Sequence, residues 1–379
     1  MILLTIIVFI LILGALIIVH EFSHFIFARK TGMRVEEFGI GYPPRIIGCF
    51  RKENKWKIFF GSKTPKIKST IYSFNLLPFG GFNKIYGMES REKSSGSFWS
   101  KSIGKRAIVV FAGVLGNFLL AIILFSIGYG LGLPEIIEGE PPANAKEVGV
   151  QIILVNGNSP AEKAGIKIGD KILKIKSQDS EVKIVNEVED VQEFIEKKLN
   201  HPITLILKRG NRILEKEVTP RENPPKGQGP IGIGLAKTAR IPYPWYQALL
   251  KGIKSTFLLT EATFEALFQL LKGAITKEIP SGVELTGPVG IGSLVFHMID
   301  LGWIYVLQFT AILSLNLAIL NILPFPALDG GRLIFLLIEK IRKKPIKAEI
   351  ENLVNQIGIA LLIILMIAVT FKDIQRLWG

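Results

Sequence analysis

Four long stretches of the sequence hold no charged residue and are almost entirely apolar. They cover residues 1–19, 107–134, 301–328 and 352–371. A helix needs about 20 mainly apolar residues to cross a membrane, and each stretch is near that length or longer. The first stretch lacks the basic start and small-residue cleavage site of a signal peptide, so we expect it to be retained. The pattern predicts a polytopic α-helical membrane protein with about four transmembrane helices in a lipid bilayer.

The segments between these stretches predict the rest of the fold. Residues 66–88 are expected to form short strands with a turn at residues 78–81, as a β-hairpin beside the membrane or as part of an ordinary loop domain. Residues 146–220 predict a small α/β domain, with a short helix capped by Ser159. Residues 245–272 form an amphipathic pattern, and we expect this helix to lie on the membrane surface.

The chain thus divides into transmembrane helices and the parts that connect them. The expected parts are a first transmembrane helix (1–30), a membrane-associated β region (31–103), a second transmembrane helix (104–134), the small α/β domain (135–225), a linker with the amphipathic helix (226–300), a third transmembrane helix with the segment that follows it (301–350), and a fourth transmembrane helix (351–379). The charges of the connecting parts indicate on which side of the membrane each one lies.

The basic charge of the chain, +14 in all, is distributed unevenly. Residues 26–106 hold 17 Lys and Arg against 5 Asp and Glu, and residues 330–351 hold 6 against 3, whereas residues 135–300 hold 21 of each. Because loops rich in Lys and Arg stay in the cytoplasm, we expect the first two segments there and both termini outside with the α/β domain. No compact basic motif accompanies this charge, so nucleic-acid binding is not expected.

The end of the first apolar stretch carries the motif HEFSH at residues 20–24. On a helix, His20 and His24 lie four residues apart on one face, so both imidazoles can bind one zinc ion, while Glu21 can take a proton from a water molecule. The ordinary alternative is a helix end with two interfacial histidines and a snorkelling glutamate. Because ionisable groups are costly in a stretch otherwise free of charge, the motif favours a functional site.

The third ligand of such a zinc site is expected to be a carboxylate, because the chain has one cysteine, Cys49, and two other histidines, His201 and His297, on the opposite side. Asp329 is the best candidate, since it follows the third apolar stretch on the same side as HEFSH. We expect residues 330–331, both glycine, to let the backbone turn there. Asp329 could instead be the N-cap of the next helix.

Together these motifs resemble the site-2 protease family of intramembrane zinc metalloproteases, and most closely its bacterial regulator-of-sigma-E branch in peptidase family M50. The resemblance rests on HEFSH, on NILPFPALDGG at residues 321–331, and on the α/β domain, which resembles a PDZ domain. The sequence departs from some members in one respect: they carry two tandem PDZ domains, whereas the extracytoplasmic segment here has room for only one PDZ-like domain. The resemblance implies that His20, His24 and Asp329 bind Zn2+ and that Glu21 is the catalytic base.

The resemblance also implies where a substrate binds. The matching residues are Asn321, Asn316, Pro324, Gly80, Gly81 and Phe82. Two further family motifs match GVLGN at residues 113–117 and TGPVGIG at residues 286–292. The groove of the PDZ-like domain would lie near VGVQIILV at residues 148–155, although the domain could also be a spacer.

The implied function is an intramembrane zinc metalloendopeptidase that cleaves single-pass membrane proteins within or near their transmembrane segment. The expected substrate is an anti-sigma factor already cut by a site-1 protease, with remnant signal peptides as a further class. The expected location is the bacterial inner (cytoplasmic) membrane, with the active site near the cytoplasmic side. Two alternatives remain: a non-catalytic pseudo-protease or chaperone that binds membrane helices, and a transporter, which the lack of an inverted repeat disfavours.

Overall fold

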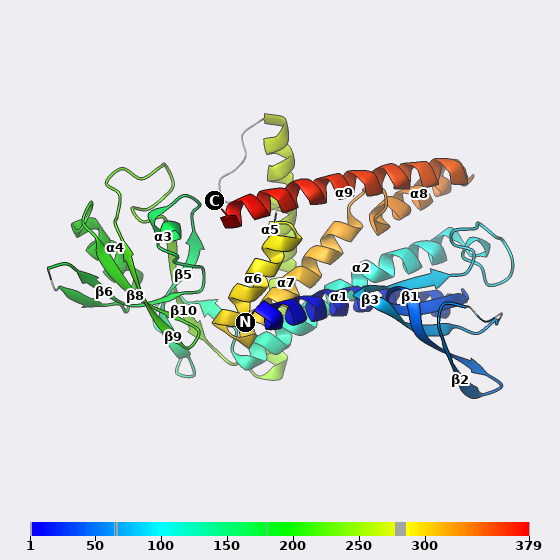
Figure 1. Cartoon of the computed structure of the whole chain (residues 1–379), viewed down its shortest axis with the longest axis horizontal. Helices are drawn as coiled ribbons and strands as arrows, with labels where there is room; N and C mark the ends of the chain where they lie inside the picture. The colour runs from blue at the N-terminus through cyan, green and yellow to red at the C-terminus, as the bar shows by residue number, and fades with distance from the viewer. Residues whose placement is uncertain (1, 64, 66, 180, 277–285, 379) are drawn as a thin grey trace.

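The computed structural model describes residues 2–63, 65, 67–179, 181–276 and 286–378. Helices occupy the middle of the molecule, with an α/β domain at one end and a three-stranded sheet at the other (Figure 1). Within the described residues, four helices are long and apolar enough to cross a membrane. They are α1 (Ile2–Lys30), α2 (Ile103–Leu131), α7 (Trp303–Ile322) and α9 (Ala348–Trp378). They coincide with the four charge-free stretches, so that prediction is confirmed.

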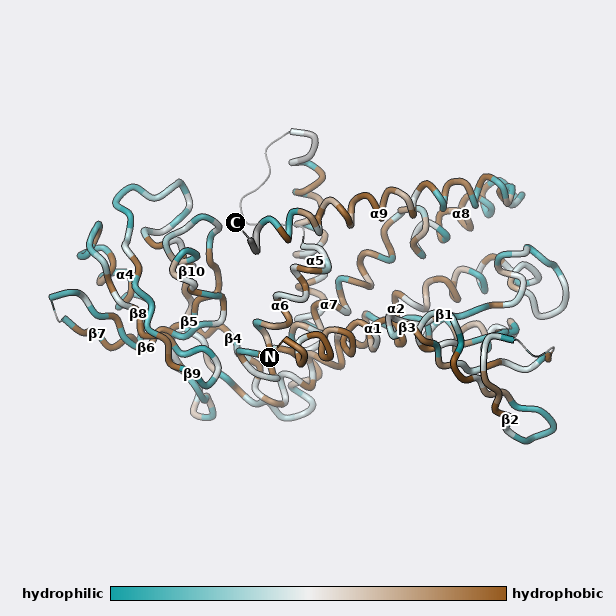
Figure 2. Tube along the Cα trace, in the orientation of Figure 1, coloured by the Kyte–Doolittle hydropathy of each residue, from teal (hydrophilic) through white to brown (hydrophobic). Residues whose placement is uncertain are grey.

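These helices are rich in apolar residues, as the brown colouring along much of α1, α2, α7 and α9 shows (Figure 2). In α9, for example, Leu361 and Ile364 are 51% and 63% exposed. Contiguous apolar surface of this kind marks contact with lipid or another apolar partner. Lipid can cover helices without cost because their backbone groups are already hydrogen-bonded within each helix. Both chain ends lie on the side of the α/β domain (Figure 1).

The three-stranded sheet lies beside α1 and has the order β2-β1-β3. Its strands are β1 (Val35–Lys52), β2 (Lys55–Phe60) and β3 (Ile71–Ile85). Residues 37–40 of β1 pair with residues 81–84 on one side and with residues 71–74 on the other. The hairpin predicted within residues 66–88 is therefore wrong in its pairing. β3 bends near the expected turn into two arms, residues 71–74 and residues 81–84. The two arms do not pair with each other, because residues 37–40 of β1 lie between them and pair with both.

Two features hold this sheet in its folded-back form. β1 reverses at Gly41, which has a φ of +78°, and a Cβ there would lie 2.6 Å from the carbonyl oxygen of Leu77. The buried Glu37 carboxylate accepts hydrogen bonds from Arg45 Nε at 3.0 Å and from Ser73 Oγ at 2.6 Å. These bonds tie the two arms of β1 to the first arm of β3. The second arm of β3 is thereby placed against α1.

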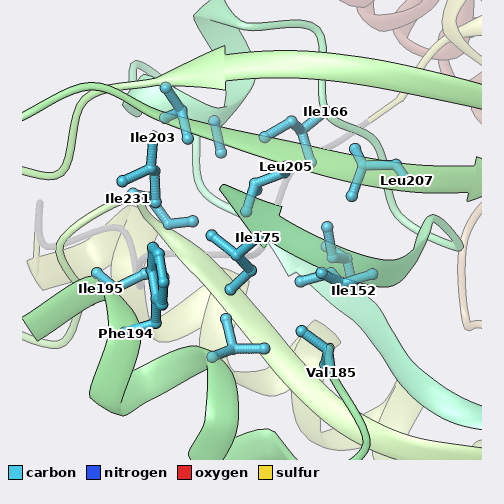
Figure 3. Close-up of a cluster of buried hydrophobic side chains, with 14 of the residues drawn as sticks. Ile152, Ile166, Ile175, Val185, Phe194, Ile195, Ile203, Leu205, Leu207 and Ile231 are labelled. Atoms are coloured by element: carbon cyan, nitrogen blue, oxygen red, sulfur yellow. The ribbon is translucent and has the colours of Figure 1, made fainter. Parts of the chain in front are cut away.

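The α/β domain, residues 134–240, contains a seven-stranded sheet with the order β4-β10-β5-β6-β8-β9, and β7 pairs with β6. Its elements are β4 (Pro134–Ile136), β5 (Lys146–Val155), α3 (Pro160–Lys163), β6 (Lys171–Ser177), β7 (Val182–Ile184), α4 (Val188–Lys197), β8 (Ile203–Arg209), β9 (Arg212–Val218) and β10 (Ile233–Arg240). As predicted, Ser159 caps α3, its Oγ accepting a hydrogen bond from the Glu162 backbone. The branched side chains of the inner strands and α4 form the buried core, including Ile152, Leu205 and Phe194 (Figure 3).

The peptide groove predicted near residues 148–155 falls on β5. β5 lies between β10 and β6 in the sheet order, but its register with β6 covers only Val150 and Gln151, whereas its pairing with β10 extends along most of the strand. A peptide can be added as a strand only at an open sheet edge. In the described residues, the strands at the ends of the sheet order are β4 and β9. Residues 152–155 of β5 have no register partner in β6, so the groove near residues 148–155 stays a prediction.

The remaining helices lie in the segments between the three-stranded sheet, the α/β domain and the four long helices. They are η1 (Phe98–Ser100), α5 (Trp245–Thr276), α6 (Pro288–Leu301) and α8 (Asp329–Arg342). α5 lies across α2 and α7 (Figure 1), and Tyr129 and Ser255 join it to α2 through a 2.6 Å hydrogen bond. Its expected place on the membrane surface stays a prediction. Residues 277–285 of the predicted linker lie outside the described residues.

The α/β domain rests directly on α6. Arg212 forms an ion pair with Asp300, and His297 Nε2 lies 2.5 Å from the carbonyl oxygen of Ile168. The backbone of Gly210 comes so close that a Cβ there would lie 2.3 Å from the Asp300 carbonyl oxygen. One residue, Gly302 with a φ of +127°, separates α6 from α7. The α/β domain, α6 and α7 therefore follow one another with little intervening chain.

The ion pair between Arg209 and Asp170 yields a prediction about the stability of the α/β domain. Arg209 Nε lies 2.7 Å from Asp170 Oδ1, and the two side chains are 8% and 0% exposed. Arg209→Met leaves a buried carboxylate without its cation, so we expect the free energy of unfolding of the domain to fall by about 3–5 kcal/mol. Thermal unfolding of the full chain in detergent measures this. The matched control is Lys176→Met in an exposed pair with Glu215, which should change stability by at most about 0.5 kcal/mol.

Candidate active site

Three side-chain atoms from two helices converge at one point near the sheet end of α1. His20 and His24 lie on one face of α1, and Asp329 is the first residue of α8. Asp329 Oδ2 lies 3.1 Å from His20 Nε2 and 3.4 Å from His24 Nε2, and the two Nε2 atoms are 3.1 Å apart. The three residues that the sequence predicted to form one site therefore lie together in the structure.

The spacing and chemistry of these atoms fit a tetrahedral zinc ion. Ligand atoms about 2.0–2.1 Å from zinc at tetrahedral angles lie about 3.3 Å from one another, close to the three separations found here. His24 Nδ1 donates a hydrogen bond to the carbonyl oxygen of Val109 at 2.8 Å, which leaves a lone pair on Nε2. Among the described residues, Asp329 Oδ2 has no hydrogen-bond donor. Lone pairs that face one another at this distance need a cation between them.

The loop between α7 and α8 places Asp329. α8 is capped by Leu328, and Asp329 is already helical, so the alternative role of Asp329 as N-cap is not found. Gly330 and Gly331 are required for close backbone approach and not for a turn, which corrects the prediction. A Cβ on Gly330 would lie 2.1 Å from the Leu323 carbonyl oxygen, and one on Gly331 would lie 2.3 Å from that of Phe325. The loop thus folds tightly onto the start of α8.

α2 supports the histidines through the motif GVLGN. A Cβ on Gly113 would lie 2.4 Å from His24 Nε2, and one on Gly116 would lie 2.0 Å from Ser23 Oγ. Asn117, which is fully buried, has its Nδ2 atom 3.3 Å from His20 Nδ1. The sequence predicted for GVLGN only a match to a family motif, without a role for Asn117. A polar residue such as Asn117 within an apolar span was the signal that it has a further role.

The contact between Asn117 and His20 concerns the tautomer of the imidazole. The amide nitrogen and oxygen of an asparagine exchange places by rotation, and their assignment follows the hydrogen-bond network. Asn117 Oδ1 has no partner among the described residues. With the amide turned, Oδ1 accepts a hydrogen bond from His20 Nδ1–H, and His20 Nε2 then keeps its lone pair. Asn117 and Val109 thereby orient the two imidazoles in the same way.

A cavity of about 300 Å3 lies beside the three converging atoms. Its lining includes Glu21, and from the predicted substrate-binding residues it includes Asn321, Gly81 and Phe82. The other three predicted residues, Asn316, Pro324 and Gly80, do not line this cavity in the described part of the chain. The sequence reasoning missed further lining residues, namely Tyr42, Asn83, Ile85, Met88, Val109, Val110, Ala327 and Arg332. Burial, together with the nearby Glu21 carboxylate, raises the pKa of the Tyr42 phenol, so it remains a hydroxyl donor.

A second cavity of about 330 Å3 adjoins the first. Met88, Val110 and Arg332 line both. Its far wall contains Glu351 at the start of α9, which forms an ion pair with Arg91 of the loop after β3. The two cavities together form a polar region that runs from Glu21 towards the sheet end of the molecule.

Comparisons with known proteins place this site in a family. The sequence model of peptidase family M50 matches residues 8–63 and 59–365. A Clostridium perfringens protein described as a zinc metalloprotease is 35% identical over 361 residues, covering 95% of this chain and 96% of the relative. Zinc metalloprotease RasP of Oceanobacillus iheyensis is 29% identical over 465 residues, covering 99% of each chain. Regulator of sigma E protease of Haemophilus influenzae is 27% identical over 468 residues, covering 97% and 98%.

The family match covers most of the chain, including HEFSH and Asp329. Two of these three relatives are named zinc metalloproteases, in agreement with the spacing of the three converging atoms. The membrane-spanning character of the four long helices agrees with the sequence analysis. The chain therefore belongs to peptidase family M50, and its activity is that of a zinc metalloprotease.

Proposed function

We propose that this metalloprotease cleaves single-pass membrane proteins within or near their transmembrane segment. The observation that carries the proposal is the position of the converging atoms. Two of them belong to α1, a helix apolar enough to cross a membrane, and the cavity beside them holds Glu21. Ionisable groups at such a depth are tolerated where they face water or one another. A polar cavity within the helices supports hydrolysis at that depth.

Each residue has a role in this proposal. His20, His24 and Asp329 hold Zn2+, and Asn117 and Val109 fix the imidazoles from behind. When bound, zinc acts as a Lewis acid towards a carbonyl group and makes a water molecule more acidic. Glu21 lines the same cavity. We assign it as the general base that takes a proton from the attacking water and passes it to the leaving amine.

The substrate must reach this site as an extended chain, because a helix hides its peptide groups in internal hydrogen bonds. β3 is the last strand in the order of the three-stranded sheet, and its second arm contributes Gly81 and Phe82 to the cavity. An unwound segment can add to such an edge as a further strand. Asn321, at the end of α7, lines the cavity as well. We assign it to bind the freed substrate backbone.

The expected substrate is an anti-sigma factor that a site-1 protease has already cut, and remnant signal peptides are a second class. A relative named regulator of sigma E protease supports the first class. The loop charges support an inner-membrane protein with the active site near the cytoplasm and the α/β domain, PDZ-like in this proposal, outside. The three-stranded sheet and the α/β domain at opposite ends of the helices agree with that arrangement (Figure 1).

The role of Glu21 is tested by Glu21→Gln with a tagged single-span substrate in detergent. We expect cleavage to fall by at least about 100-fold, because general-base catalysis contributes about that factor or more. Zinc content should stay the same, since the Glu21 carboxylate is not one of the converging atoms. A chelator should abolish cleavage by the wild type, and the exposed Glu265→Gln variant should cleave normally. Wild-type cleavage by Glu21→Gln would refute this role, and stoichiometric zinc without any cleavage would favour a non-catalytic helix-binding protein.

The support of His20 by Asn117 is tested by zinc affinity. Asn117→Leu removes the acceptor for His20 Nδ1, so we expect zinc affinity to fall by about 10–100-fold. Asn117→Asp keeps an acceptor at that position and should retain most of the affinity. Competition with a chelator of known affinity measures both variants. Equal zinc affinity in the wild type and Asn117→Leu would contradict the role of Asn117.

The approach of α2 to α1 is tested at Gly113. A methyl group on Gly113 would lie 2.4 Å from His24 Nε2, so we expect Gly113→Ala to displace the imidazole and to lose bound zinc. The matched control is Gly104→Ala on the same helix, where a Cβ meets nothing within 4 Å. Zinc content after gel filtration separates the two. Full zinc content in Gly113→Ala would show that the helices can move apart at this point.

A further inference from the structure

The second arm of β3 carries a polar side chain whose hydrogen-bonding groups are unused. Asn83 lines the same cavity as Glu21 and Asn321. Both its Nδ2 and its Oδ1 are buried, and neither has a hydrogen-bond partner among the described residues. The cross-strand neighbour of Asn83 in β1 is Phe38, an apolar residue. Nothing in the sheet therefore accounts for an amide at this position.

A buried amide without partners is costly, and such groups are rare in native structures. The other buried asparagines of this region differ from Asn83. Asn75 donates to the carbonyl oxygens of Ile40 and Gly41, and Asn117 contacts His20. Asn83 alone among these three has both atoms unpartnered. An unsatisfied polar group in the wall of an active site indicates a partner that arrives with the ligand.

The chemistry of the amide indicates which part of a substrate it binds. An asparagine side chain offers donors and an acceptor side by side, which matches the C=O and N–H of a peptide group. Transmembrane segments contain few polar side chains, but every residue that leaves the helix exposes its peptide groups, and these must be satisfied in a low-dielectric site. The freed backbone is thus the partner that every membrane substrate supplies.

We propose that Asn83 is a substrate-binding residue, whose side-chain amide forms hydrogen bonds with the peptide groups of the unwound substrate segment. This inference rests on the proposed function. Asn321 of α7 and Asn83 of β3 line the same cavity, so two amides from different elements are available to the extended chain. In the free enzyme the unpartnered Asn83 amide destabilises the fold. In the complex its donors and acceptor form hydrogen bonds with the substrate backbone.

Asn83→Leu keeps the size of the side chain and removes its hydrogen-bonding groups. We expect the KM for a single-span substrate to rise about 10-fold, with a smaller change in kcat. The temperature of unfolding should stay the same or rise, because an unpartnered buried amide is lost. A merely structural role would instead lower the unfolding temperature. The matched control is Lys84→Gln, an exposed neighbour on the same strand, which should change neither quantity.

A binding measurement keeps this inference separate from the proposed function. The substrate is titrated against Glu21→Gln and against the double variant Glu21→Gln with Asn83→Leu, both loaded with zinc. We expect the double variant to bind about 10-fold more weakly. Equal affinity of the two proteins would overturn the role of Asn83, whether or not the wild type cleaves. Failure of the wild type to cleave would count against the proposed function alone.

Discussion

The close packing of α2 against α1 is the contact on which the metal site depends. Gly113 and Gly116 leave no room for a Cβ, so the backbone of α2 lies directly against the histidine face of α1. The same approach brings the Val109 carbonyl and the Asn117 amide within reach of the two imidazoles. The Nδ1 atom of each imidazole faces α2, where the neighbouring helix supplies its partner. Small residues and polar partners therefore occur together on one helix face.

Asp329 and the three-stranded sheet complete the site from two other directions. Gly330 and Gly331 allow the loop after α7 to fold onto α8, which brings the carboxylate to the histidines. On the opposite side, β1 folds back on itself through the Glu37, Arg45 and Ser73 contacts and presents β3 to the cavity. In the proposed membrane-associated position of this sheet, polar backbone is tolerated because protein covers it or it faces the polar cavity.

The sequence was sufficient for features that depend on local pattern. Charge-free stretches predicted the four long helices, and helical periodicity placed His20 and His24 on one face. Features that depend on distant segments were missed. The insertion of β1 between the arms of β3 is determined by pairing between distant strands. The partners of Asn117 and the unpartnered state of Asn83 likewise appear only when separate helices and strands are brought together.

The short connection at Gly302 fixes the distance between the α/β domain and the cavity. The α/β domain rests on α6, a single glycine leads into α7, and the 20 residues of α7 end next to the cavity. At about 1.5 Å per residue this helix is about 30 Å long. The distance between the α/β domain and the cavity is therefore set by the length of α7. Under the proposed function, this fixed length sets the depth at which a membrane substrate meets the active site.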